Sequence, residues 1–177
     1  MDDLRSSGGT SILEIGSGSG RNTQAMRSRG FEVMAVADDR IDLLATEVTG
    51  RAFDGALSSH GLLHGTRAGI DAVLQSTAAA LRSAAPLYAT FGSKSDVRYG
   101  AGKQIDAGVF VAESGEEAGV AHAFFDRAGL RALLERDFTI IELREESVDR
   151  VVGRWAHRSR PTGSVHWFVR ARRKQRA

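Results

Sequence analysis

Residues 11–20 read SILEIGSGSG, a short apolar run followed at once by glycines at every second position. The run is predicted to be a buried strand, and residues 21–29 a helix that ends at Gly30. Glycines between a strand and a helix allow positive φ and let a ligand approach the backbone closely. The free N–H groups at the start of the helix favour an anionic group on that ligand. The stretch is therefore expected to form a ligand-binding turn.

The glycine spacing differs from two familiar phosphate-binding patterns. Counted from Gly16, a dinucleotide fingerprint needs glycine at the sixth position, which here is Arg21. A P-loop needs Gly-Lys-Ser or Gly-Lys-Thr after four free positions, and the sequence contains no such string. A nicotinamide-dependent oxidoreductase is thus a distant alternative.

Strands and helices are predicted to alternate along the first two thirds of the chain. Residues 31–37, 53–59 and 86–92 are apolar enough for buried strands, and residues 67–82 form an amphipathic helix. This order indicates an α/β fold with a mostly parallel sheet.

The last third of the chain has a different pattern. A helix is expected over residues 124–136 with Asp126 as N-cap, followed by strands over residues 138–143 and 164–171. Because the connection between these strands is too short for a helical crossover of ordinary size, they are expected to form an antiparallel edge pair.

Composition and length fit one soluble domain over residues 1–177. The formal charge is +2, and the absence of cysteine excludes disulfide scaffolds, Cys-ligated zinc, iron–sulfur clusters and thiol nucleophiles. The polar start is unlike a signal peptide, and no apolar stretch approaches the roughly 20 residues that span a bilayer. A cytoplasmic protein without a membrane partner is expected.

The acidic–x–Gly–x–Gly–x–Gly pattern of residues 14–20 resembles motif I of the class I S-adenosylmethionine-dependent methyltransferases. Residues 53–64 (FDGALSSHGLLH) resemble motif IV, and residues 81–86 (LRSAAP) stand where the family has a Leu-x-Pro-Gly-Gly turn. Residues 121–126 (AHAFFD) look like the start of a late helix in that family. Residues 20–23 (GRNT) are similar to small-molecule members such as the tellurite-resistance type.

The resemblance covers most of the chain and implies a single-domain, Rossmann-like methyltransferase fold. It also implies S-adenosylmethionine as cofactor, S-adenosylhomocysteine as product, and methyl transfer to a small-molecule acceptor by in-line displacement. A non-catalytic relative that keeps the fold is the alternative.

The resemblance also implies which residues bind the cofactor. The motif I residues Gly16, Ser17, Gly18, Gly20 and Arg21 would hold the methionine carboxylate. Glu14 would orient the loop or the cofactor amino group, or else be a satisfied carboxylate at a strand end. After motif IV, Ser59 and His60 would line the cofactor, although His60 also fits a helix start.

The family has an acidic residue at the end of the second strand, where it binds the ribose hydroxyls. Ala37 stands at that position here, and Asp38 follows it. A carboxylate offers two acceptors to a vicinal diol, so Asp38 is expected to bind the ribose with Asp39 as the fallback. A solvated turn is the alternative for both.

Residues 38–53 are too few for the helix and third strand that the family usually places there. Either residues 41–46 are that strand without its helix, or they form a short helix and the strand is missing. In the first case Glu47 would occupy the position that contacts the adenine amino group. In the family, helices that precede the first strand in the sequence cover the cofactor, and these helices are not expected here.

No catalytic residue is identified. A general base is needed only if the acceptor must lose a proton, and His64 and His122 are the candidates for it. No metal site is predicted, because the His60–His64 spacing lacks an intervening Glu and is interrupted by Gly61. The two remaining histidines, His157 and His166, are interpreted as structural.

Residues 93–123 are Gly-rich and weakly patterned, which is typical of a substrate-side loop or lid. Four aromatic side chains form either an acceptor pocket or part of the core: Tyr99, Phe110, Phe124 and Phe125. Residues 170–177 are interpreted as a solvated basic tail. A nucleic-acid methyltransferase is a weaker alternative, because the Asn/Asp-Pro-Pro-Tyr/Phe motif is absent after Ser59.

Overall fold

The computed structural model describes residues 4, 8–37, 40–41, 44–115, 117–148 and 162–175. Its strands are β1 (Ser11–Ile15), β2 (Glu32–Val36), β3 (Gly55–Ser58), β4 (Pro86–Ser93), β5 (Lys103–Asp106), β6 (Val109–Val111), β7 (Ala121–Phe125), β8 (Phe138–Ser147) and β9 (Val165–Arg173). Its helices are α2 (Arg21–Arg27), α3 (Leu44–Glu47), α4 (Arg67–Ala80), α5 (Arg127–Leu134) and the 3-10 turn η2 (Gly61–Leu63).

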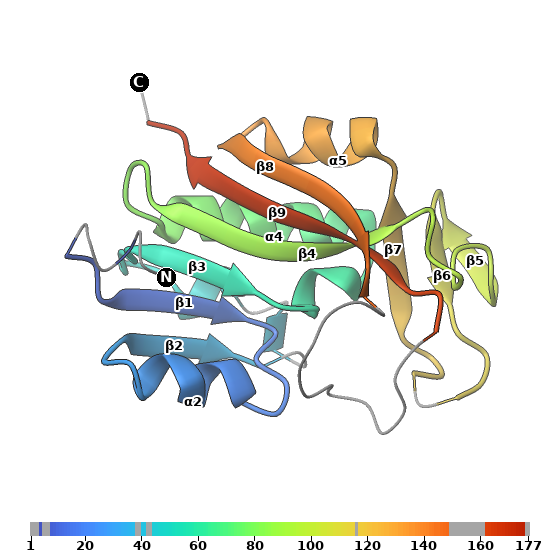
Figure 1. Cartoon of the computed structure of the whole chain (residues 1–177), viewed down its shortest axis with the longest axis horizontal. Coiled ribbons are helices and arrows are strands. Elements are labelled where there is room, and N and C mark those ends of the chain that lie inside the picture. The colour runs from blue at the N-terminus through green and yellow to red at the C-terminus, as the bar shows by residue number, and fades with distance from the viewer. Residues whose placement is uncertain are drawn as a thin grey trace.

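The strands form one mixed sheet. Its order is β2-β1-β3-β4-β7-β6-β5, and β9 lies between β4 and β8. Strands β2, β1, β3 and β4 are parallel, whereas β9 is antiparallel to both of its neighbours. The predicted mostly parallel sheet with an antiparallel closing pair is confirmed. The carboxyl ends of the parallel strands all point towards β5, β6 and β7 (Figure 1).

Alternate residues of β1 face two different parts of the core. Leu13 and Ile15 belong to the large cluster that also contains buried residues of α3, α4 and α5. Ile12 belongs to a smaller cluster with Met26 of α2 and Phe31. Burial on both faces explains why this strand is apolar at successive positions. It also directs Glu14 to the same face as α2.

Residues 93–123, expected to be a substrate-side loop or lid, contain regular secondary structure. Strands β5 and β6 form an antiparallel hairpin, and β6 also pairs with β7. Strand β7 then pairs with the last two residues of β4, Gly92 and Ser93. Residues 121–125 are thus a strand rather than a helix start, since a short apolar run does not distinguish the two until its partner is known. Helix α5 begins only at Arg127, and Asp126 caps it as predicted by accepting a 2.8 Å bond from Gly129 N.

The short-helix alternative holds for the described part of residues 38–53. Residues 44–47 form α3, and none of the described residues in this range lies in a strand. Buried Leu44 and Val48 attach this turn to the large core cluster.

The expected basic tail is largely part of β9, which extends to Arg173. The guanidinium of Arg172 donates to Ala84 O at 3.2 Å, and that of Arg173 donates to Ala78 O. The ammonium of Lys174 donates to Glu135 O. These cations therefore hold the end of β9 against α4 and against the segments that precede β4 and follow α5.

None of the helices among the described residues is long and apolar enough to span a membrane.

Candidate functional site

The glycine-rich turn lies at the carboxyl end of β1, as predicted. Gly16, Gly18 and Gly20 have φ values of 70°, 49° and 73°. The amides of Gly16 and Ser17 donate to Val36 O at 2.9 and 3.1 Å, which fixes the turn to the end of β2. Gly18 is exposed at its crest. The turn is therefore held at its base and open to a ligand above.

Glu14 is buried directly below this turn, with 1% of its surface exposed. Its Oε2 accepts a hydrogen bond from the hydroxyl of Thr23 in α2. Its Oε1 makes no hydrogen bond of good geometry with any described residue. Burial raises the pKa of this carboxyl, although Thr23 and Asn22 oppose the shift. An unsatisfied buried carboxylate oxygen attracts a cationic donor such as an ammonium group.

The segment after β3 packs tightly against the same turn. A Cβ on Gly61 would lie 2.6 Å from Ile15 O and 2.8 Å from Gly16 Cα. Both contacts are with backbone, which has little room to move. The motif IV region thus helps to shape the motif I turn.

We expect Gly61→Ala to lower the free energy of unfolding by about 1–3 kcal/mol, because the added methyl group overpacks this contact. Urea denaturation measures the change. The matched control is Gly69→Ala in α4, where the new Cβ would lie 3.3 Å from one side-chain hydroxyl, that of Thr66. Equal stability of the Gly61 variant and the unmodified chain would contradict the close packing.

Ser59 and His60 lie at the carboxyl end of β3, beside the turn expected to hold the cofactor. His60 has a φ of 73°, and its amide donates to Thr90 Oγ1 at 2.9 Å. Its Nδ1 lies 3.3 Å from Ser59 Oγ. Glu47 lies at the end of α3, where it pairs with Arg40. The expected ribose ligands, Asp38 and Asp39, lie outside the described residues, as does His157.

A buried polar network occupies the carboxyl end of β4. The Asp96 side chain is fully buried and accepts bonds of 2.9 and 3.2 Å from the Arg98 guanidinium. The same guanidinium lies 3.1 Å from His166 Nε2. The His166 ring is also in edge contact with the His60 ring, with centroids 5.1 Å apart. His166, interpreted as structural, is thus a buried member of this network.

Burial lowers the pKa of His166 to about 3, and the charges of His60 and Arg98 add to the effect. Because this pKa lies below that of an unfolded histidine, the contribution of His166 to stability is full above pH 6.5 and is lost as the pH drops towards 3. At pH 5 the loss amounts to about 2 kcal/mol.

We therefore expect His166→Gln to reduce the difference in unfolding free energy between pH 7.5 and pH 5 by about 2 kcal/mol. Glutamine keeps a side-chain acceptor for Arg98 but does not titrate. Urea denaturation of both proteins at the two pH values gives the comparison. An unchanged difference would show that the buried imidazole does not cause the loss.

Two other histidines meet a carboxylate nearby. Glu117 lies in the turn between β6 and β7, with Oε1 3.6 Å from His64 Nε2 and Oε2 3.2 Å from His122 Nε2. Arg98 NH1 lies 3.3 Å from Oε2. The interactions with His122 and His64 hold the pKa of Glu117 well below its usual range. Both candidate bases therefore share one carboxylate.

The aromatic residues separate into two groups. Tyr99, Phe110 and Phe124 form a cluster with ring centroids 5.3–6.2 Å apart, and Phe124 stacks on His122. Phe125 instead packs against Phe91 in the core. The first group lies beside the histidine pair, in the region expected to face the acceptor.

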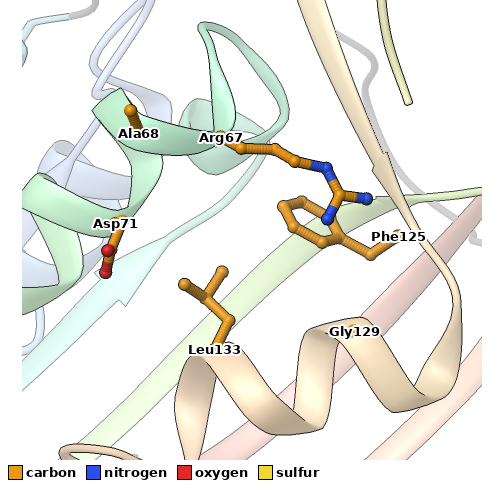
Figure 2. A pocket seen from close by; sticks show the side chains of 6 residues that line it. All are labelled: Arg67, Ala68, Asp71, Phe125, Gly129 and Leu133. Atoms are coloured by element: carbon orange, nitrogen blue, oxygen red, sulfur yellow. The ribbon is translucent and has the colours of Figure 1, made fainter. Parts of the chain in front are cut away.

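A cavity of about 310 Å³ lies elsewhere, between α4 and α5. Figure 2 shows Arg67 extending over the Phe125 ring, with Leu133 and Gly129 on the α5 side. The guanidinium carbon lies 4.6 Å from the ring centroid. Because none of the glycine-rich turn lines this cavity, its position does not match the candidate cofactor site.

Sequence reasoning missed Glu117, Asp96 and Arg98. They occur in a segment without periodicity, and each also has a partner that is distant in the sequence: Val165 for Asp96, His166 for Arg98 and His64 for Glu117. The one available signal was their residue type, since ionisable groups after a parallel strand tend to lie near a binding edge.

The comparisons with known proteins bear on the fold. No model of a known protein family matches the sequence, and no curated protein matches it. A methyltransferase from Methanosarcina mazei, described as S-adenosylmethionine-dependent, is 21% identical with a TM-score of 0.70, covering 95% of this chain and 94% of that one. The 1,6-didemethyltoxoflavin-N1-methyltransferase from Burkholderia thailandensis, with bound 1,6-didemethyltoxoflavin and S-adenosylhomocysteine, is 20% identical with a TM-score of 0.67, covering 97% of this chain and 75% of that one.

The N-methyltransferase NodS from Bradyrhizobium japonicum, in complex with S-adenosylhomocysteine, is 13% identical with a TM-score of 0.57, covering 94% of this chain and 79% of that one. These likenesses extend over nearly the whole chain. The chain therefore has the Rossmann-like fold of the class I methyltransferases, and the fold expected from the resemblance is confirmed.

Proposed function

We propose that this chain is an S-adenosylmethionine-dependent methyltransferase that acts on a small molecule. The observation that carries the proposal is the glycine-rich turn above Glu14, whose buried Oε1 makes no hydrogen bond of good geometry with a described residue. S-adenosylmethionine carries an ammonium group and a carboxylate at its methionine end, and the first suits this oxygen. Two structures of the same fold contain the product S-adenosylhomocysteine, which supports the same choice of cofactor.

Within this proposal, Gly16, Ser17, Gly18, Gly20 and Arg21 hold the methionine end of the cofactor. Glu14 receives its amino group, and Ser59 and His60 line it at the end of β3. Asp38 binds the ribose. Glu47 has no role in this proposal, because its expected contact with the adenine required a strand over residues 41–46, and residues 44–47 form α3 instead. The cofactor supplies an activated methyl group on a sulfonium.

The protein then has to align the acceptor with the methyl group and exclude water. Strands β5, β6 and β7 lie beyond the carboxyl ends of β1 and β3, where they form a wall rather than an open loop (Figure 1). The aromatic cluster of Tyr99, Phe110 and Phe124 supplies an apolar surface on this side. His64 or His122 would accept a proton where the acceptor has to lose one.

An acceptor panel tests the proposed reaction. The purified chain is incubated with S-adenosylmethionine labelled in its methyl group and with small amines, phenols, thiols and heteroaromatic rings. We expect labelled product from at least one small molecule and none from RNA or DNA. Tight cofactor binding with no transfer to any acceptor would instead favour a non-catalytic relative. Transfer only to nucleic acid would contradict the proposed acceptor class.

A further inference from the structure

His64, Glu117 and His122 reach one point from three separate segments. His64 follows η2, Glu117 lies between β6 and β7, and His122 belongs to β7. One ligand atom from each side chain lies within 4.8 Å of the other two. Ligands held about 2.0–2.2 Å from one ion are separated from each other by roughly 3.0–3.5 Å. The two distances from Glu117, 3.6 and 3.2 Å, are close to that spacing.

The orientation of His122 favours a cation at this point. Its Nδ1 lies 3.1 Å from Val120 O. A carbonyl oxygen only accepts, so Nδ1 carries the proton and Nε2 of the neutral ring presents a lone pair. This Nε2 is buried and lies 3.2 Å from Oε2 of Glu117, so a cation can take the place of the proton that the two atoms would otherwise share. Histidine ligands of metal ions commonly donate their other N–H to a backbone carbonyl in this way.

The net charge around these three side chains is compatible with a bound divalent cation. Arg98 is the cation next to Glu117, but its guanidinium makes two bonds to the buried carboxylate of Asp96. Asp96, Arg98 and Glu117 together carry a net charge of −1, which partly offsets the charge of a divalent ion. The side chains of His64 and Glu117 are 30% and 22% exposed, so an ion from solvent reaches them.

We propose that His64, Glu117 and His122 form a binding site for a first-row divalent transition metal ion of the Zn²⁺ type. A ligand set of two imidazoles and one carboxylate favours such ions over Mg²⁺ or Ca²⁺, which prefer oxygen ligands. Three protein ligands leave at least one coordination position for water or a donor atom of another molecule. The site does not depend on the proposed methyl transfer, but an ion bound by both Nε2 atoms would prevent His64 and His122 from acting as its general base.

The test is titration of the metal-free full chain with Zn²⁺ by calorimetry, and with Co²⁺ by its visible absorption. We expect one ion per chain. Glu117→Gln and His64→Asn should each weaken Zn²⁺ binding at least about 10-fold, because loss of a direct ligand costs no less than loss of its supporting partner. Glu113→Gln, which changes an exposed carboxylate in the same segment, is the matched control and should bind as the unmodified chain does.

Thermal unfolding with a chelator present shows whether each variant is folded. Because the His64 side chain is partly exposed, His64→Asn should disturb folding less than a change at a buried position. It therefore provides the Zn²⁺-binding test if Glu117→Gln proves unstable. Absence of Zn²⁺ binding to the unmodified chain would overturn the proposal. So would Zn²⁺ binding that both folded variants retain, since the ion would then be adventitious. Binding of Zn²⁺ without binding of S-adenosylmethionine supports the metal site and contradicts only the proposed enzymatic function.

Discussion

Gly18→Val is expected to weaken binding of S-adenosylmethionine and S-adenosylhomocysteine at least about 100-fold. The glycine has a φ of 49° and lies exposed at the crest of the turn. A β-branched residue adopts this conformation at a cost of about 1–3 kcal/mol, and relief of that strain changes the course of the turn. Its side chain also projects from the surface that the cofactor is proposed to contact.

Calorimetric titration of the variant gives the affinity. Gly30→Val is the matched control, because Gly30 has a φ of 85° at the opposite end of α2 and a Cβ there would meet nothing within 4 Å. This control should lose similar stability while it binds the cofactor as before. Unchanged affinity in the Gly18 variant would show that the cofactor does not contact the turn.

The second large effect is expected from Glu14→Gln. This change keeps the size of the side chain and an acceptor for Thr23, but it removes the charge that would bind the cofactor ammonium group. A hydrogen bond to a charged group contributes about 1.5–3 kcal/mol, so affinity should fall about 10- to 150-fold for both cofactor forms.

The stability of the Glu14→Gln variant should not fall with its cofactor affinity. Burial raises the pKa of Glu14, so its contribution to stability is full below the pKa of an unfolded carboxyl and is lost as the pH rises through the folded value. At pH 7 the glutamine variant should therefore unfold at the same or a higher urea concentration than the unmodified chain. Glu32→Gln, at an exposed position of β2, is the control for both measurements. Unchanged binding with lower stability would indicate a purely structural carboxylate.

Local sequence signals were sufficient to predict the part of the fold that contains the glycine-rich turn. The apolar run of β1, the glycines after it, the end of the first helix at Gly30 and the amphipathic pattern of α4 are all signals from neighbouring residues. Asp126 was identifiable as a helix cap for the same reason. Glu14 was selected by its position before the glycines, although its unsatisfied oxygen depends on packing with α2.

Features that depend on distant partners were not predictable. Strand β7 pairs with β4 and β6 in opposite orientations, and nothing within residues 121–125 specifies either partner. Likewise, His64 and His122 become neighbours only through an isolated backbone bridge between them. Glu117 completes that group from a turn without periodicity. The His60–His64 spacing in the sequence therefore could not reveal that His64, Glu117 and His122 lie together.

The most direct test of the proposed function is calorimetric titration of the purified chain with S-adenosylmethionine and S-adenosylhomocysteine, with NADH as the control ligand. We expect saturable binding of the first two, one molecule per chain, and no heat of binding from NADH. Binding of NADH alone, or of none of the three, would contradict the assignment of the glycine-rich turn and Glu14 as an S-adenosylmethionine site.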